Sequence, residues 1–161
     1  QILRDLESGS SLEKAIDKAR IAGTIEADPR LDLDGWDAAY KLLILCRAIW
    51  DPSLTLEAAV TRGVSAFGET ELAEARSRGR RVRLIATGER SGGTVRLRTE
   101  CEALDPEDRF YALGPAEKAV SFETEVMGAI TVSSTRGGPM ATAASVLKDV
   151  LNIASPLRPF A

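Results

Sequence analysis

The sequence predicts an α+β protein in which helices pack on one face of a mainly antiparallel or mixed sheet of about four strands. Two observations lead to this fold class. Apolar residues recur at helical spacing through most of residues 2–78. From Arg81 onward the apolar pattern has a period of two residues, as in β-strands. The chain has 161 residues, of which 44% are hydrophobic and 28% charged, as is ordinary for a globular protein. We therefore expect residues 1–161 to form one domain.

Two short helices are predicted at the beginning of the chain. Residues 2–7 are typical of a helix that stops at the Ser-Gly-Ser sequence ending at Ser10. The next helix begins near Leu12, where Ser10 or Ser11 can cap it by accepting a hydrogen bond from a free backbone amide. Gly23 ends this helix, since glycine is the usual residue just beyond a helical C-terminus.

An acidic loop leads into the most apolar helix of the chain. This helix is predicted from about Asp34 to Ile49, and Asp32 or Asp34 can cap it with a side-chain carboxylate. From Leu42 to Cys46 the helix is apolar on all sides, so we expect this part to be buried.

The first turns of the same helix carry a polar stripe. Asp34, Asp37 and Lys41 are spaced i, i+3 and i+7, so they share one helical face. Asp37 and Lys41 are four residues apart, which places their Cβ atoms roughly 5–6 Å from each other. A polar stripe on a buried helix must face a partner or a cavity, because unpaired buried charge is costly. The alternative is an ordinary surface ion pair beside a solvated acidic loop.

The second half of the chain is predicted to hold two hairpins and a final helix. In the strand that begins near Thr94, apolar residues alternate with arginines, so one face of the sheet is expected to contact water. In chain order, the predicted elements are helices over 55–61 and 69–78, strands over 81–89, 94–103, 118–124 and 129–133, and a helix over 140–153.

Composition argues against several classes of function. The chain has no histidine, the commonest metal ligand and general base, and we expect no metal site. The net charge is -3 without a basic patch, so we expect no nucleic-acid partner. Cys46 and Cys101 lie far apart, which is typical of free thiols in a reducing compartment. No apolar stretch reaches eighteen residues, so we expect no membrane segment.

Three separated segments of the chain resemble one enzyme family in order and spacing. The run from Glu26 to Leu45, with its four aspartates and Lys41, is similar to the substrate-site segment of homoserine dehydrogenases. Residues 63–86 resemble the middle section of that family, and residues 115–147 resemble its C-terminal section.

The resemblance implies a reversible oxidation of L-homoserine to L-aspartate-4-semialdehyde with NAD or NADP, in the biosynthesis of threonine, methionine and isoleucine. It also implies a cytoplasmic protein and a homodimer formed through the sheet. Members of the family carry an N-terminal Rossmann domain with a glycine-rich loop, and no such loop occurs in these 161 residues. We therefore expect the chain to be the catalytic, substrate-binding domain of a longer enzyme and to be inactive alone.

The resemblance also assigns roles to individual residues. Glu26 would bind the substrate ammonium, with Asp32 beside it in the pocket, because carboxylates form charge-assisted hydrogen bonds with ammonium groups. Lys41 would act as acid or base at the reacting oxygen, since a protonated lysine can donate to the alkoxide that forms when hydride reaches the aldehyde. Asp37 would orient Lys41. A weaker expectation places Gly137 and Gly138 against the cofactor.

Two other functions stay open at this point. Thr24 and Arg136 depart from the family's pattern, which would suit a related oxidoreductase acting on another amino or hydroxy acid. The absence of the glycine-rich loop would suit a non-catalytic module for dimerisation or ligand binding.

Overall fold

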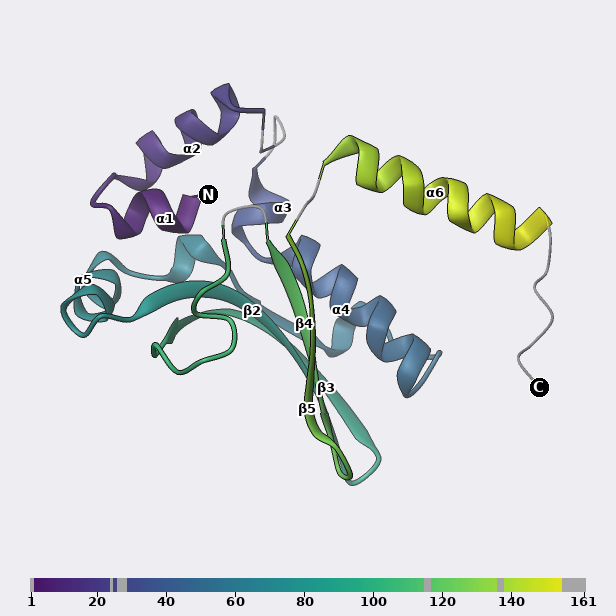
Figure 1. The fold of residues 1–161 in the computed structure, drawn as a ribbon. Coiled ribbons are helices and arrows are strands. Elements are labelled where there is room, and N and C mark those ends of the chain that lie inside the picture. The colour runs from purple at the N-terminus through teal and green to yellow at the C-terminus, as the bar shows by residue number, and fades with distance from the viewer. Residues whose placement is uncertain (1, 24, 26–28, 115–116, 136–137, 155–161) are drawn as a thin grey trace. The chain divides into compact units, whose positions relative to one another are not determined.

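The computed structural model describes residues 2–23, 25, 29–114, 117–135 and 138–154. They belong to two compact units, Gln1–Tyr111 and Ala112–Ala161, and each unit is described below by itself. The α+β class is confirmed, with helices beside a mixed sheet in the first unit and an antiparallel hairpin in the second (Figure 1). The expectation of a single domain over residues 1–161 stays a prediction.

The first unit contains most of the regular structure. Its elements are α1 (Ile2–Glu7), α2 (Leu12–Ile21), α3 (Arg30–Leu33), α4 (Trp36–Ile49), η1 (Leu56–Ala58), β1 (Ala59–Arg62), η2 (Val64–Ala66), α5 (Glu69–Ser77), β2 (Arg81–Ser91) and β3 (Thr94–Leu104), where η marks a short 3-10 helix. The predicted cap at Ser11 is confirmed, because its side chain accepts a hydrogen bond from the backbone amide of Lys14.

The sheet of this unit has the strand order β1-β3-β2, with β3 in the middle. β2 runs antiparallel to β3 from Arg81, opposite Leu104, to Ser91, opposite Thr94, and β1 runs parallel to β3. Because side chains alternate along a strand, the odd-numbered residues of β3 share one face. That face carries the β3 residues of the two apolar clusters, Val95, Leu97, Cys101 and Ala103. The even-numbered face carries Arg96 and Arg98, both exposed, so the predicted wet face is confirmed there, although Leu104 at the end of the strand is buried.

The helices supply the rest of the core, and they cover the odd-numbered face of β3. Leu43 and Cys46 of α4 pack with Leu97 of β3, together with Leu42, Trp50, Leu54, Leu56, Ala59 and Val95. A second cluster joins α5 to β2 through Leu72, Ala75 and Val82, with α1 side chains packed against it. The prediction that helices pack on one face of the sheet is therefore confirmed. Among these helices, α4 makes the most extensive contact with the sheet.

Strand β1 was not expected, because the sequence predicts a helix over residues 55–61. The structure has a single 3-10 turn, η1, followed directly by the strand. Its four residues include Val60 and Thr61, which are β-branched and favour extended backbone. Parallel pairing with β3, from Ala59 opposite Leu97 to Arg62 opposite Glu100, then satisfies the backbone groups that a helix would have paired locally.

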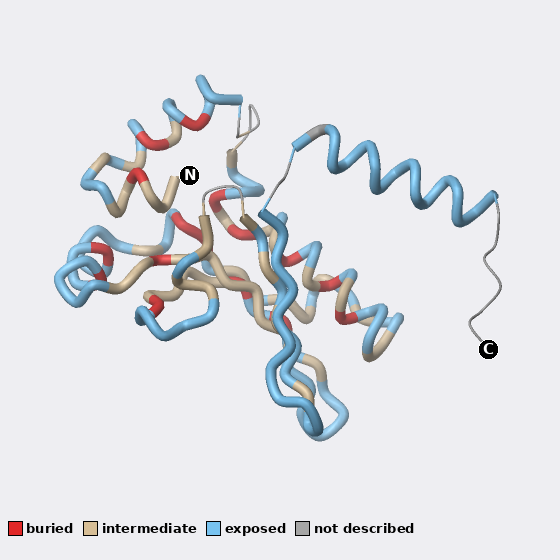
Figure 2. Tube along the Cα trace, viewed as in Figure 1, coloured by how far each residue is buried: buried red, intermediate tan, exposed pale blue. Residues whose placement is uncertain are grey.

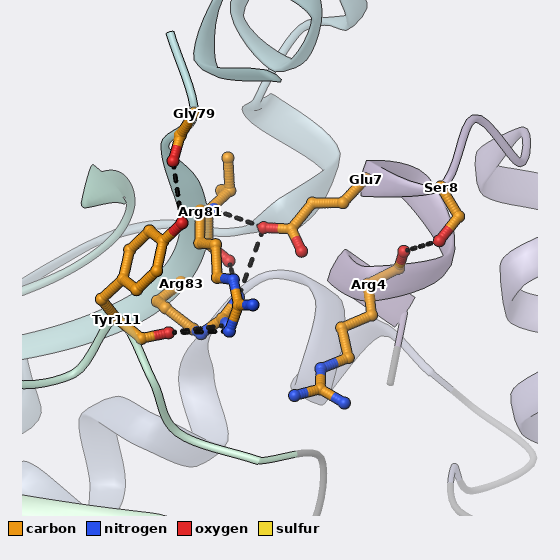
Figure 3. Close-up of polar contacts among 8 residues, drawn as sticks. Arg4, Glu7, Ser8, Gly79, Arg81, Arg83 and Tyr111 are labelled. Carbon is orange, nitrogen blue, oxygen red and sulfur yellow. Dashed lines mark hydrogen bonds and ion pairs between the residues drawn. The ribbon is translucent and has the colours of Figure 1, made fainter. Parts of the chain in front are cut away.

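Tyr111 closes the first unit against the edge strand β2 (Figure 3). Its hydroxyl donates to the carbonyl of Gly79 at 2.9 Å, and its carbonyl accepts from the guanidinium groups of Arg81 and Arg83 at 3.3 and 3.2 Å. Arg81 also lies over the Tyr111 ring, 4.7 Å from its centroid. These contacts anchor the last residue of the unit on Arg81 and Arg83, two alternate residues of β2, and on Gly79 just before the strand.

The carboxylate of Glu7, at the end of α1, protects the outer edge of β2 at the same place. Its Oε1 accepts from the backbone amide of Val82 at 2.6 Å and from Arg83 at 3.3 Å. An unpaired edge amide invites pairing with another strand, and an acceptor on that amide removes the opportunity. Burial lowers the pKa of Arg83, although the negative charge of Glu7 opposes this effect.

The second unit consists of β4 (Lys118–Thr124), β5 (Gly128–Ser134) and α6 (Pro139–Ala154). Both strands and the helix lie where the alternation and the final helical repeat predict them. Nearly all described residues of β5 and α6 are exposed, in contrast to the first unit (Figure 2). Within the described residues, no helix combines the length and the apolar character that crossing a bilayer requires.

Replacing Glu102 of β3 with glutamine is expected to stabilise the protein more at pH 7 than at pH 4. Burial raises the pKa of Glu102 above its usual value, an effect that the positive charge of Arg98 opposes. A raised folded-state pKa means that the folded protein holds this proton more tightly, so its stability falls as the pH rises through the folded pKa. Thermal unfolding of both proteins at the two pH values tests this, and an advantage of the glutamine variant that shrinks toward pH 7 would contradict it.

Candidate functional site

The acidic segment forms a tight turn between two helices. α3 ends at Leu33, and the amide of Asp34 still donates to the carbonyl of Arg30 at 2.8 Å. Gly35 follows with φ of 83°, in the left-handed region that glycine adopts without steric cost. Its carbonyl accepts the first hydrogen bond of α4, from Ala39 at 3.0 Å.

The predicted cap of this helix is therefore wrong. Neither Asp32 nor Asp34 caps α4, because Asp32 lies within α3 and Asp34 ends that helix. Gly35 occupies the capping position, and glycine has no side chain that could bond to the free amides. The physical reason is the sharp change of direction between α3 and α4, which requires a left-handed residue where the carboxylate was expected.

α4 has one buried face and one exposed face. Ala39, Leu43 and Cys46 are buried toward the sheet. The expectation that residues 42–46 are buried on all sides is wrong, since Ile44 is 66% exposed. A three-stranded sheet covers one side of a helix only, so the opposite side of α4 remains open within this unit. Tyr40, half exposed, lies on that open side beside Ile44.

Asp37 and Lys41 form an ion pair on the open side of α4. The distance between Asp37 Oδ2 and Lys41 Nζ is 2.5 Å, and the two side chains are 49% and 62% exposed. The pairing predicted from their spacing is therefore present, but the stripe does not face the interior of this unit. An exposed i, i+4 pair is worth about 0.3–0.5 kcal/mol, so a ligand could separate the two groups at little cost.

The other predicted site residues lie in different places. Asp32 is exposed on α3. Glu26 and Gly137 lie outside the described residues. Gly138 precedes α6 in the second unit with φ of 109°, and its carbonyl accepts from the amides of Ala141 and Thr142. Within the described residues, the structure thus brings together Asp37 and Lys41 of the predicted site.

Asp34, the third member of the stripe, has a partner that the sequence did not indicate. The hydroxyl of Ser65, in η2, lies 3.5 Å from Asp34 Oδ1. η2 follows β1 directly, so this contact joins the acidic turn to the end of a strand. No local pattern could have revealed it, because the two residues are 31 positions apart. Asp34 is therefore better described as part of the turn's support than as part of an open polar stripe.

The open face of α4 combines groups that suit a small polar ligand. The Lys41 ammonium can donate a proton or hydrogen bonds to an oxygen, and the Asp37 carboxylate holds it from one helical turn away. Tyr40 and Ile44 present apolar surface on the same side of the helix. A charged pair beside exposed apolar side chains is typical of a surface that a ligand or another part of the protein covers.

Comparison with known proteins gives a consistent result. The family model described as "Homoserine dehydrogenase" matches residues 1–151. An NAD(+)-dependent homoserine dehydrogenase from Pseudomonas canavaninivorans is 31% identical over 153 residues, which are 94% of this chain and 44% of that protein. A homoserine dehydrogenase from Bacillus subtilis is 26% identical over 95% of this chain and 35% of its own length.

Solved structures are similar over the same stretch. A crystal structure of S. aureus homoserine dehydrogenase at pH 6.5 matches with a TM-score of 0.84 and 27% identity, covering 95% of this chain and 39% of that chain. A putative homoserine dehydrogenase from Archaeoglobus fulgidus matches with a TM-score of 0.79 and 28% identity, over 94% of this chain and 46% of that chain. The chain therefore spans less than half the length of these relatives.

Proposed function

We propose, since this chain belongs to the homoserine dehydrogenase family, that residues 1–161 are the substrate-binding and catalytic part of an NAD(P)-dependent homoserine dehydrogenase. The reaction interconverts L-homoserine and L-aspartate-4-semialdehyde, a cytoplasmic step in amino-acid biosynthesis. The observation that carries the proposal is the Asp37–Lys41 pair, which stands exposed on α4 within the segment that the family model matches.

Lys41 acts at the reacting oxygen of the substrate. In the reductive direction the aldehyde oxygen gains negative charge, and the Lys41 ammonium donates a proton to it. In the oxidative direction the Lys41 amine accepts the hydroxyl proton. Asp37 Oδ2, at 2.5 Å from Nζ, restricts the position of the ammonium and balances its charge.

The substrate's own charges explain the acidic turn. L-homoserine carries an ammonium group, which carboxylates bind by charge-assisted hydrogen bonds. Glu26 and Asp32 supply these carboxylates in the proposal, on the segment just before α4 in the chain. In the proposal, one small amino acid contacts these carboxylates and Lys41 together.

The described residues do not supply all the elements that a dinucleotide cofactor needs. A dinucleotide site needs a strand, a glycine-rich loop and a helix whose amides receive the pyrophosphate. Gly138 precedes a helix, but β5, the strand before it, pairs antiparallel with β4 in a hairpin and does not belong to a parallel strand-loop-helix unit. We therefore assign the binding of NAD or NADP to residues other than the described ones, and no step above is derived from the cofactor.

The test is an activity assay of the complete encoded protein. With homoserine and NAD or NADP, we expect formation of the reduced cofactor, followed by its absorbance, with homoserine preferred over other hydroxy and amino acids. Preference for a different substrate would indicate a related oxidoreductase, and no turnover with any cofactor at any pH would contradict the proposal. Light scattering of the same protein tests the proposed homodimer, for which we expect twice the mass of one chain.

A further inference from the structure

We propose that Gly63 is a positioning residue for Lys41, acting through the turn formed by Leu33, Asp34 and Gly35. This inference rests on the proposed function, because it concerns the placement of the group that moves a proton. Gly63 lies between β1 and η2. Its effect would reach Lys41 through the backbone contact that it makes with the turn.

The contact between Gly63 and the turn leaves no room for a side chain. A Cβ atom on Gly63 would lie 1.9 Å from the carbonyl oxygen of Leu33 and 2.3 Å from the Cα of Asp34. Both are backbone atoms, so no rotation of a neighbouring side chain could relieve the overlap. The backbone of Gly63 has φ of -74° and ψ of -170°, which any residue adopts. Glycine is therefore required here by the close approach and not by its conformation.

Strand pairing and buried side chains restrict movement on both sides of this contact. Arg62, the residue before Gly63, is paired with Glu100 at the end of β1, so the sheet fixes the chain at this point. Val64 on one side of the contact and Leu33 on the other are both buried. Ser65 adds its contact with Asp34 at 3.5 Å. The turn before α4 is thus seated on the end of a strand.

The position of this turn determines where Lys41 lies. α4 begins directly after Gly35, and Lys41 follows within two helical turns, about 9 Å along the axis. A rotation of the helix by about 10° moves a group at ~6 Å from its axis by ~1 Å. A misplacement of about 1 Å in an active site can lower the rate about 100-fold. A displaced turn therefore has a measurable effect at Lys41 even when the protein stays folded.

The test is a double-mutant cycle in the complete encoded protein. Gly63→Ala should lower kcat for homoserine about 100-fold, measured at a temperature where circular dichroism shows the variant to be folded. In the Lys41→Ala background the same change should lower kcat less than about 3-fold, because the group that Gly63 positions is already absent. Equal losses in both backgrounds would overturn the proposal, since a purely structural role acts independently of Lys41.

Gly68→Ala is the matched control. Gly68 has the same φ of -74°, and a Cβ atom there would meet only the flexible end of Glu71 at 3.4 Å. Gly68→Ala should leave kcat unchanged relative to each background, the unmodified protein and Lys41→Ala. A loss comparable to that of Gly63→Ala would show that any added methyl group in this region lowers the rate, and would also overturn the proposal.

A second variant decides the question if Gly63→Ala does not fold. Gly35→Ala disturbs the same turn more mildly, since its Cβ would lie 3.0 Å from Thr99 Cγ2, and Gly92→Ala controls for the left-handed conformation in open space. Gly35→Ala should show the same dependence on Lys41, and independence from it would overturn the proposal. If the unmodified protein has no turnover, the proposed function fails. Hydrogen exchange of residues 34–41 then tests the structural step alone: faster exchange in Gly35→Ala than in Gly92→Ala supports the hold of this turn on the start of α4, and unchanged exchange overturns it.

Discussion

Replacing Lys41 with alanine is expected to lower kcat for homoserine about 10²–10⁴-fold while changing KM much less. The expectation follows from the proposed role of Lys41 at the reacting oxygen, where its contribution is greatest in the transition state. The side chain is 62% exposed and pairs with Asp37, which is itself 49% exposed, so its removal should not unfold the protein. Steady-state kinetics with the complete encoded protein, alongside a thermal unfolding curve, measure both effects.

Lys14→Ala provides a matched control, because Lys14 is also an exposed lysine on a helix, α2, outside the proposed site. It should leave kcat unchanged. Asp37→Asn should give a smaller decrease in kcat than Lys41→Ala, since it removes the charge that holds the ammonium and leaves the ammonium itself. A Lys41→Ala variant that keeps its kcat and loses only substrate affinity would assign Lys41 to binding and would contradict its role in proton transfer.

Much of the fold could be predicted because local signals mark its boundaries. The β2–β3 hairpin turns at Gly92 and Gly93, which have φ of 56° and 82°, and the pattern of alternation on both sides predicts the strands to within two residues. α5 and α6 follow helical repeats with clear ends. β1 could not be predicted, because its four residues become a strand only through pairing with β3, a partner more than thirty residues further along the chain.

In the candidate site, too, some features follow from local sequence and others depend on contacts between distant segments. The pairing of Asp37 with Lys41 follows from their separation by four residues, which is a property of any helix. The direction of that pair, away from the sheet, depends on how many sides of α4 the sheet covers, and no window of sequence carries that information. The support of the turn by Gly63 and Ser65 likewise depends on a contact between segments that are distant in the chain.

Replacing Gly88 of β2 with alanine is expected to lower the free energy of unfolding by about 3 kcal/mol, at the upper end of the usual cost of overpacking. A Cβ atom on Gly88 would lie 2.6 Å from the Sγ atom of Cys46 and 3.4 Å from atoms of Leu42 and Trp50. All three side chains belong to the cluster by which α4 packs on the sheet. α4 would have to move away from the strand, so denaturant unfolding should detect the loss directly.

A second substitution should reverse most of this loss. Cys46→Ala removes the one atom that lies too close, so the Gly88→Ala/Cys46→Ala double variant should be more stable than Gly88→Ala alone. In the unmodified background the same cysteine change should be destabilising, because it leaves a cavity in the core. Gly68→Ala, whose Cβ meets no fixed atom, controls for adding a methyl group. A double variant whose loss equals the sum of the two single losses would contradict the close approach of Gly88 to Cys46 as the cause of the loss. Recovery would show that one missing side chain on the strand sets the separation of the helix that carries Lys41.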